Sequence, residues 1–118
     1  MIGMSAEEVK LGYMTDSVTG TTTDSYDTVF SKKTAVFDRK TIIIKNTGSN
    51  SLDYKVLVYA VEGGVSHSPA SSSLAGGATA LIALNDLHYK VEVQVKSSSA
   101  GASTTYRIDA IFEWDTRR

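Results

Sequence analysis

Alternating apolar and polar residues in the last third of the chain constrain the fold more than any other feature. Apolar side chains recur at every second position across residues 89–95 and again across residues 106–114, with mostly polar residues between them. A period of two is typical of a β-strand that buries one face. A stretch rich in Ser, Gly and Ala separates the runs, so the sequence predicts an antiparallel hairpin with one buried face.

Further strand candidates are residues 26–30, 34–37, 41–45, 52–61 and 78–84. Residues 41–45 are β-branched and precede a cluster of Asn, Gly and Ser that favours a turn. Residues 78–84 leave a helical alternative open. Residues 62–77 contain the only proline and many serines and glycines, so we expect an irregular connection there.

These short strands, with turn signals between them, predict an all-β fold. We expect a single antiparallel β-sandwich of about six to eight strands, either jelly-roll or immunoglobulin-like. The length of 118 residues, with 42% hydrophobic residues, suits one folded domain.

The first 25 residues are expected to form an N-terminal segment or arm, and residues 26–118 the β-sandwich domain. Residues 15–25 are rich in Thr, Ser and Asp, with Val18 as the single aliphatic residue. An arm of this kind would become ordered on the exposed strand edge of another subunit.

The charge and cysteine content exclude several classes of function. Twelve basic and 13 acidic side chains give a net charge of -1, so we expect neither nucleic acid nor a membrane surface as partner. The absence of cysteine removes disulfides, thiolate nucleophiles and thiolate-bound zinc. We expect no cleaved signal and no membrane span, and the simplest interpretation is folding in a cytosol.

No catalytic, cofactor-binding or metal site is predicted. Residues 64–68 resemble a nucleophile elbow around Ser66, but Ser68 replaces the second glycine and no helix follows. His67 and His88 lack metal-ligand spacing. We therefore expect no cofactor and no enzymatic activity.

Four apolar residues interrupt the polar phase of their strands and are candidates for a protein contact: Leu57, Tyr59, Val61 and Ile111. Exposed apolar side chains with a polar surround are typical of interfaces. Alternatively, a second sheet or the N-terminal segment covers them. Trp114 continues the inward phase of its strand, which favours a core position over a sugar-stacking one.

The segments KTIIIKNTGSNSLDYKVLVYA (residues 40–60) and HYKVEVQVKSSSAGASTTYRIDAIFEW (residues 88–114) resemble small β-sandwich structural proteins of tailed phages and related viruses, including decoration, tail and head-to-tail adaptor proteins. The resemblance implies a noncatalytic virion structural or accessory protein. It would be assembled in the host cytoplasm, and its partners would be further copies of itself or other virion proteins. No residue-level site is carried over.

Similar strand patterns occur in immunoglobulin-like adhesion and carbohydrate-binding modules. A glycan- or ligand-binding module is therefore the alternative. Its site would lie among the loops of residues 63–77 and 97–103, with Tyr59 or Trp114 stacked on a sugar.

Overall fold

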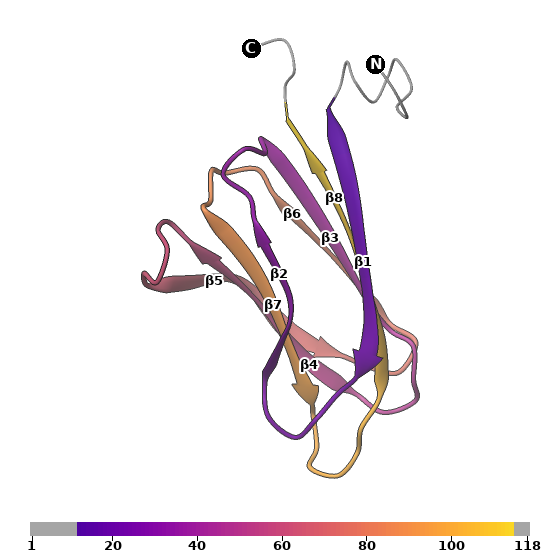
Figure 1. The fold of residues 1–118 in the computed structure, drawn as a ribbon. Coiled ribbons are helices and arrows are strands. Elements are labelled where there is room, and N and C mark those ends of the chain that lie inside the picture. Colours follow the sequence, from indigo (N-terminus) through magenta and orange to yellow (C-terminus); the bar gives the residue numbers. More distant parts are fainter. Residues whose placement is uncertain (1–11, 115–118) are drawn as a thin grey trace.

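The computed structural model describes residues 12–114. Its strands are β1 (Tyr13–Thr21), β2 (Asp27–Lys33), β3 (Arg39–Asn46), β4 (Leu52–Tyr59), β5 (Ser66–Leu74), β6 (Thr79–Leu84), β7 (Lys90–Ser97) and β8 (Thr105–Glu113). Figure 1 shows these strands in two layers. The all-β sandwich predicted from the sequence is confirmed.

Each layer is a four-stranded antiparallel sheet. One sheet has the order β1-β8-β3-β6 and the other has the order β2-β7-β4-β5. Six of the seven connections therefore pass from one sheet to the other, and only the β4–β5 connection joins neighbouring strands. Neither sheet is formed by a continuous part of the chain.

The core lies between the two sheets and follows the period-two pattern. Val56 and Val93 from one sheet and Ile108 and Phe112 from the other are fully buried. The ring of Phe112 lies 6.2 Å from the ring of Phe30, a residue of the opposite sheet, in a stacked arrangement. These contacts confirm the inward faces predicted for residues 52–58, 91–95 and 106–112.

Trp114 packs at the margin of this core, as the phase of its strand predicts. Its ring centroid lies 5.5 Å from that of Phe37, with the planes tilted by 43°. Tyr89, which the same phase places inward, is only half-buried, and its hydroxyl donates to Glu62 on the surface.

The predicted hairpin of the last two strands is wrong. β7 and β8 belong to different sheets and face each other across the core. Alternation identifies the buried face of a strand but does not identify its hydrogen-bonded neighbour. The same applies to β3 and β4, which also lie in opposite sheets.

The irregular connection predicted for residues 62–77 is also wrong, because it contains β5. This strand pairs with β4 on one side and forms an edge of its sheet. Pro69 lies where the register shifts between Val56 and Val58, a position that a proline tolerates in an edge strand. Residues 34–37, expected as a strand, form a turn instead.

Residues 13–21, expected within a separate arm, form β1 and pair with all nine residues of β8 in the same chain. Backbone hydrogen bonds to β8 hold this strand in place. Because the segment contains few apolar residues, its sequence pattern did not indicate a strand. Of its side chains only Met14 and Val18 pack against the core. Residues 1–11 of the expected arm lie outside the described residues.

A fully buried cation lies at one end of the sandwich. Lys40 of β3 has no exposed surface, and its Nζ donates to the carbonyl oxygen of Asp86 at 2.7 Å and faces that of Phe37 at 3.5 Å. Burial lowers the pKa of this amine, although Asp38 and Asp86 act in the opposite direction. The Lys40 side chain thus links the β2–β3 and β6–β7 connections to β3 through its contacts with these two carbonyl groups.

Candidate functional site

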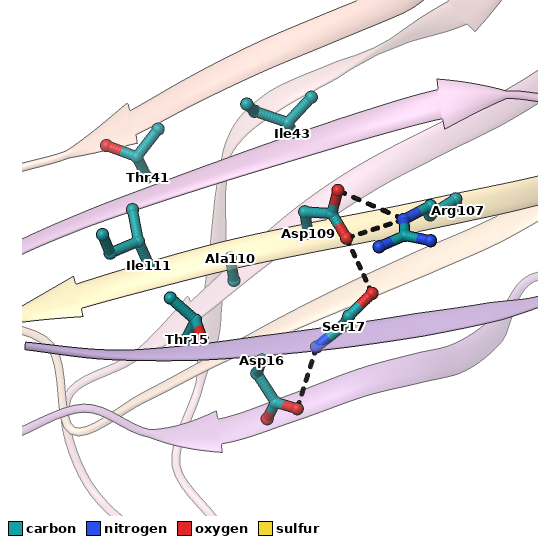
Figure 2. A pocket seen from close by; sticks show the side chains of 9 residues that line it. All are labelled: Thr15, Asp16, Ser17, Thr41, Ile43, Arg107, Asp109, Ala110 and Ile111. Carbon is teal, nitrogen blue, oxygen red and sulfur yellow. Dashed lines mark hydrogen bonds and ion pairs between the residues drawn. The ribbon is translucent and has the colours of Figure 1, made fainter.

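The outer face of the β1-β8-β3-β6 sheet carries a groove of about 510 Å³. Its lining comes from strands β1, β8 and β3: Thr15, Asp16, Ser17, Thr41, Ile43, Arg107, Asp109, Ala110 and Ile111. The strand register explains this gathering, since Ser17 and Ile43 both lie opposite Asp109, and Thr15 and Thr41 both lie opposite Ile111. Figure 2 shows the lining residues; Ala110 belongs to the core, and its side chain points away from the outer face.

An apolar strip begins in the groove and continues across β3 to β6. Ile111 of β8 is 44% exposed and Ile43 of β3 is 38% exposed, and Leu81 of β6, which is the register partner of Ile43, is 66% exposed. A second hollow of about 530 Å³ adjoins the first and shares Thr41 and Ile111 with it. An apolar centre of this kind, on three adjacent strands, is typical of a contact surface.

The polar side of the groove is held in place by hydrogen bonds. The hydroxyl of Ser17 donates to Asp109 Oδ1 at 2.7 Å, and Nε of Arg107 donates to the same oxygen at 2.9 Å (Figure 2). The Ser17 bond first, and then Arg107, hold the pKa of Asp109 below its ordinary value. Asp109 is therefore ionised and engaged across the physiological range.

At the adjoining hollow, Nε of Arg39 donates to Glu113 Oε1 at 2.6 Å. Both residues lie on the outer face, at the end of the sheet where Tyr13 of β1 also lines the hollow. Charged pairs thus lie beside the apolar strip at two places, Arg107 with Asp109 and Arg39 with Glu113. These pairs give the face a polar rim.

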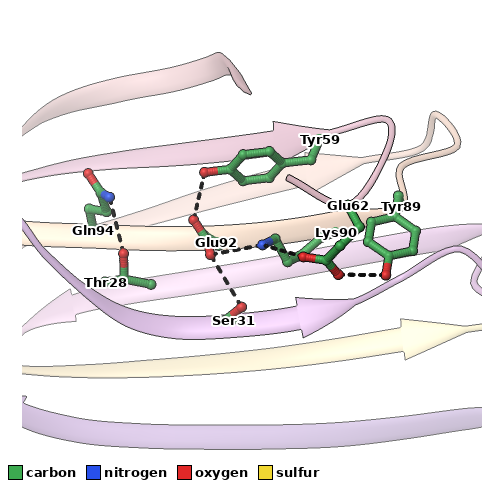
Figure 3. A network of polar contacts seen from close by, with 8 residues as sticks. All are labelled: Thr28, Ser31, Tyr59, Glu62, Tyr89, Lys90, Glu92 and Gln94. Carbon is green, nitrogen blue, oxygen red and sulfur yellow. Dashed lines mark hydrogen bonds and ion pairs between the residues drawn. The ribbon is translucent and has the colours of Figure 1, made fainter. Parts of the chain in front are cut away.

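The outer face of the other sheet has a different character. Glu92 of β7 accepts a hydrogen bond from the Tyr59 hydroxyl at 2.8 Å and forms an ion pair with Lys90 at 3.4 Å. Glu62 accepts from the Tyr89 hydroxyl at 2.7 Å. Figure 3 shows that these side chains form one connected network.

This network satisfies its own polar groups. The hydrogen bond to Glu92, together with burial, raises the pKa of Tyr59, and the Tyr89 bond lowers the pKa of Glu62. Nζ of Lys90 lies 4.6 Å from the centroid of the Tyr59 ring and covers one of its faces. We infer that the Tyr59 ring is poorly placed to stack on a ligand.

The four predicted contact residues lie in different places. Leu57 and Tyr59 are half-buried on the outer face of the β2-β7-β4-β5 sheet, and Val61, 60% exposed, follows β4 in the turn toward β5. Ile111 lies on the outer face of the opposite sheet, in the groove. No single surface contains all four.

The prediction omitted Ile43 and Leu81, which lie with Ile111 on the groove face. The signal was present in the sequence, because Ile42 and Ile44 are the inward residues of β3 and the residue between them must point outward. The same phase rule applies to Leu81 beside Ile82 in β6. It was applied to Leu57 and Ile111 but not to these two strands.

Residues 12–114 contain no cluster of three or more His, Cys, Asp or Glu side chains that could hold a metal ion. Ser66 and His67 are exposed at the start of β5, where no strand-turn-helix element raises the hydroxyl. In this part of the chain there is also no helix long and apolar enough to cross a membrane.

No protein-family model matches the chain, and a search of curated proteins finds no match. Solved structures do share the fold. A chain of the Bacillus endospore appendages, described as a novel family of disulfide-linked pili, aligns with a TM-score of 0.60 at 10% identity over 89% of both chains.

Two further structures are similar. The pre-peptidase C-terminal domain of collagenase from Bacillus anthracis has a TM-score of 0.60 at 15% identity, covering 82% of this chain and 89% of that one. The SPBc2 prophage-derived protein YomS has a TM-score of 0.54 at 15% identity, covering 85% and 95%. At these identities the likeness shows the fold alone, and proteins of several kinds share it.

Proposed function

We propose that this protein is a noncatalytic structural or accessory subunit of a virion, of the decoration, tail or adaptor type, and that it acts through contacts with further copies of itself. The observation that carries the proposal is the apolar strip of Ile111, Ile43 and Leu81 on an open sheet face. The groove and its polar rim have the composition of an interface, whereas the opposite face is occupied by its own hydrogen-bond network.

A second copy is the occupant that the charge of the chain favours. With a net charge of -1, two copies experience little mutual repulsion, and each copy carries both Arg and Asp at the groove. The pilus chain that shares the fold supports an assembling role for this protein, and the prophage-derived protein supports a phage setting. The absence of cysteine means that such an assembly would rest on noncovalent contacts.

The strand order also supports the jelly-roll alternative over the immunoglobulin-like one. Eight antiparallel strands that alternate between two four-stranded sheets, with a single hairpin between neighbours, fit a double Greek key. We accordingly interpret the protein as a jelly-roll subunit that is incorporated in the virion after synthesis in the host cytoplasm.

Sedimentation velocity over a range of concentrations tests the proposal. The parent protein should associate, and Leu81→Asp should weaken association at least tenfold, about 1.4 kcal/mol, because it places a carboxylate in the apolar strip at the β6 edge. Val65→Asp is the matched control, since Val65 is 91% exposed and lies outside the groove face. A parent protein that remains a monomer and binds neither viral particles nor assembly partners would contradict the proposal.

The alternative of a glycan-binding module is favoured by one observation, the fixed polar groups of Ser17, Asp109 and Arg107 beside Ile43 in the groove. Binding sites commonly place a few oriented polar groups next to an apolar surface. A glycan array, probed with and without calcium, distinguishes the two functions. Reproducible glycan binding that Asp109→Asn abolishes, in a protein that does not self-associate, would favour the alternative.

A further inference from the structure

The β1-β8-β3-β6 sheet ends in two edge strands that have few of the features that prevent edge pairing. Among residues 12–114, β1 and β6 each have a hydrogen-bonded neighbour on one side only, and their ladders show no register shift. β6 has the sequence TALIAL, without charge, proline or glycine. An uncharged and regular edge is a site at which another strand can add.

The edges of the other sheet are protected by comparison. β2 carries Lys32 and Lys33 and has a register shift between Thr28 and Phe30. β5 contains Pro69 and a second register shift. Lysine, proline and bulges are devices by which natural sheets resist edge-to-edge association. Only one of the two sheets is therefore suited to extension.

The strand directions permit a second copy to extend that sheet. β1 and β3 are both antiparallel to β8, and β6 is antiparallel to β3, so β1 and β6 run in opposite directions. A second copy placed beside the first in the same orientation brings its β1 antiparallel to β6. The combined sheet would be antiparallel throughout, which is the more stable form of pairing.

The free backbone groups of β1 belong to residues whose side chains lie on the outer face. Trp114 N donates to Gly12 O and Thr22 N donates to Thr104 O, so even-numbered residues of β1 bond to β8. Odd-numbered residues direct their N–H groups to the free edge. The N–H of Ser17 accordingly meets Asp16 Oδ1, at 3.0 Å, and not β8.

The same holds for β6. Asn46 of β3 accepts from Gly77 N and donates to Ala78 O, and hydrogen bonding then alternates along the ladder. Ala80 and Ile82 bond to β3, which leaves the N–H groups of Leu81 and Ala83 at the free edge. Leu81 and Ala83 are exposed on the outer face, so the two edges match in pleat as well as in direction.

We propose that β6 of one copy pairs with β1 of the next copy and extends the β1-β8-β3-β6 sheet across subunits; this deepens the proposed function and rests on it. The contact is heterologous, since each copy contributes a different edge, and it repeats from copy to copy. In the paired sheet, the apolar strip that ends at Leu81 continues onto the outer face of β1 of the next copy. Asp16, the one charged residue of β1, shields the Ser17 N–H in the single chain and must release it on pairing.

Proline at a free-edge position tests the pairing without removing a hydrogen bond of the single chain. Ala83→Pro blocks the β6 edge and Thr19→Pro blocks the β1 edge, with Ala83→Ser and Thr19→Ser as matched controls that keep the N–H. Each proline variant should be monomeric in sedimentation velocity at concentrations where the parent forms species larger than a dimer. The serine controls should associate as the parent does.

Mixing the two proline variants provides the decisive measurement. Each variant retains one intact edge, so the mixture should form a 1:1 dimer and nothing larger. A thermal melt checks that each variant is folded, and Leu81→Lys and Thr15→Lys replace any proline variant that does not melt cooperatively. They place a charge on the same edges and should give the same mixing result.

The failures are distinguishable. A parent protein that stays monomeric overturns the edge pairing, and it overturns the proposed function as well if it also binds neither viral particles nor assembly partners. If the parent associates but Thr19→Pro alone still dimerises, the contact is symmetric between β6 edges and this proposal is wrong. If both proline variants associate like the parent, the contact uses the sheet face and the edges take no part in it.

Discussion

Lys40 Nζ donates a hydrogen bond of 2.7 Å to the carbonyl oxygen of Asp86, so a lysine without exposed surface joins β3 to the connection between β6 and β7. His88 lies two residues farther along that connection, and its buried Nδ1 has no hydrogen-bond partner among residues 12–114. Burial lowers the pKa of His88, and the positive charge of Lys40 lowers it further. Two titratable groups thus share one end of the sandwich.

The stability contributed by Lys40 should rise with pH. Its folded-state pKa lies below the ordinary value of 10.5, so between the two values the unfolded chain binds more protons and the free energy of unfolding increases with pH. We expect Lys40→Met to lack this increase and to lie within about 1 kcal/mol of the parent at neutral pH, because it removes a buried charge together with its hydrogen bond. Urea denaturation of both proteins between about pH 8 and 10.5 measures the difference. If the difference in unfolding free energy between the two proteins does not change with pH, this prediction is wrong.

His88 should make the protein sensitive to mild acid. Because its folded-state pKa lies below the ordinary value of 6.5, stability is lost as the pH falls through 6.5 toward the folded value. His88→Phe should reduce the dependence of the melting temperature on pH in this window. His67→Phe, at an exposed position of β5, is the control and should retain the parent's dependence. Identical pH profiles for the two variants would show that His88 does not carry the effect.

Val93→Asp should unfold the domain or cost about 3–5 kcal/mol of the free energy of unfolding, because Val93 has no exposed surface and the substitution would bury a carboxylate in the apolar core. Val65→Asp makes the same change at a 91% exposed position and should stay within about 0.5 kcal/mol. Thermal melts compare the two. Similar losses at both positions would mean that the inward face of β7 is misassigned.

A chain that begins at Thr22 should keep the sandwich at reduced stability, by about 2–3 kcal/mol, since none of the buried core residues lies in β1. Thr22 is retained because its hydroxyl accepts from Thr104 N at 3.0 Å and contacts Ser97. A shortened chain that still folds would support the proposed domain boundary near residue 26. Loss of cooperative melting, seen by circular dichroism, would make β1 an integral strand of the domain.

The fold class and the inward faces could be predicted because each strand carries its own period-two pattern. Val56, Val93 and Ile108 were placed inward from alternation alone, and all three are fully buried. Strand pairing could not be predicted in this way. The partners of β7 and β8 are distant in sequence, and nothing local distinguishes a hairpin from a crossing to the other sheet.

The candidate site was only partly predictable. The alternation of apolar and polar residues identified Ile111 as an outward apolar residue. It could not show that Ile43 and Leu81 lie near Ile111, because their proximity depends on the order of β8, β3 and β6. Phase also placed Tyr59 outward without showing that Glu92 and Lys90 engage it. The strand β1 was missed because backbone pairing with β8, and not side-chain burial, holds it.

The position of β8 between β1 and β3 has a consequence for synthesis. At roughly 5–20 residues per second, the ribosome releases β1 several seconds before β8, the strand to which β1 bonds. Until β8 is translated, β1 lacks the strand to which it bonds and β3 lacks one of its two neighbours. Closure of this sheet is therefore a late event, completed only after translation of β8, the strand that joins the first part of the chain to the rest of the sheet.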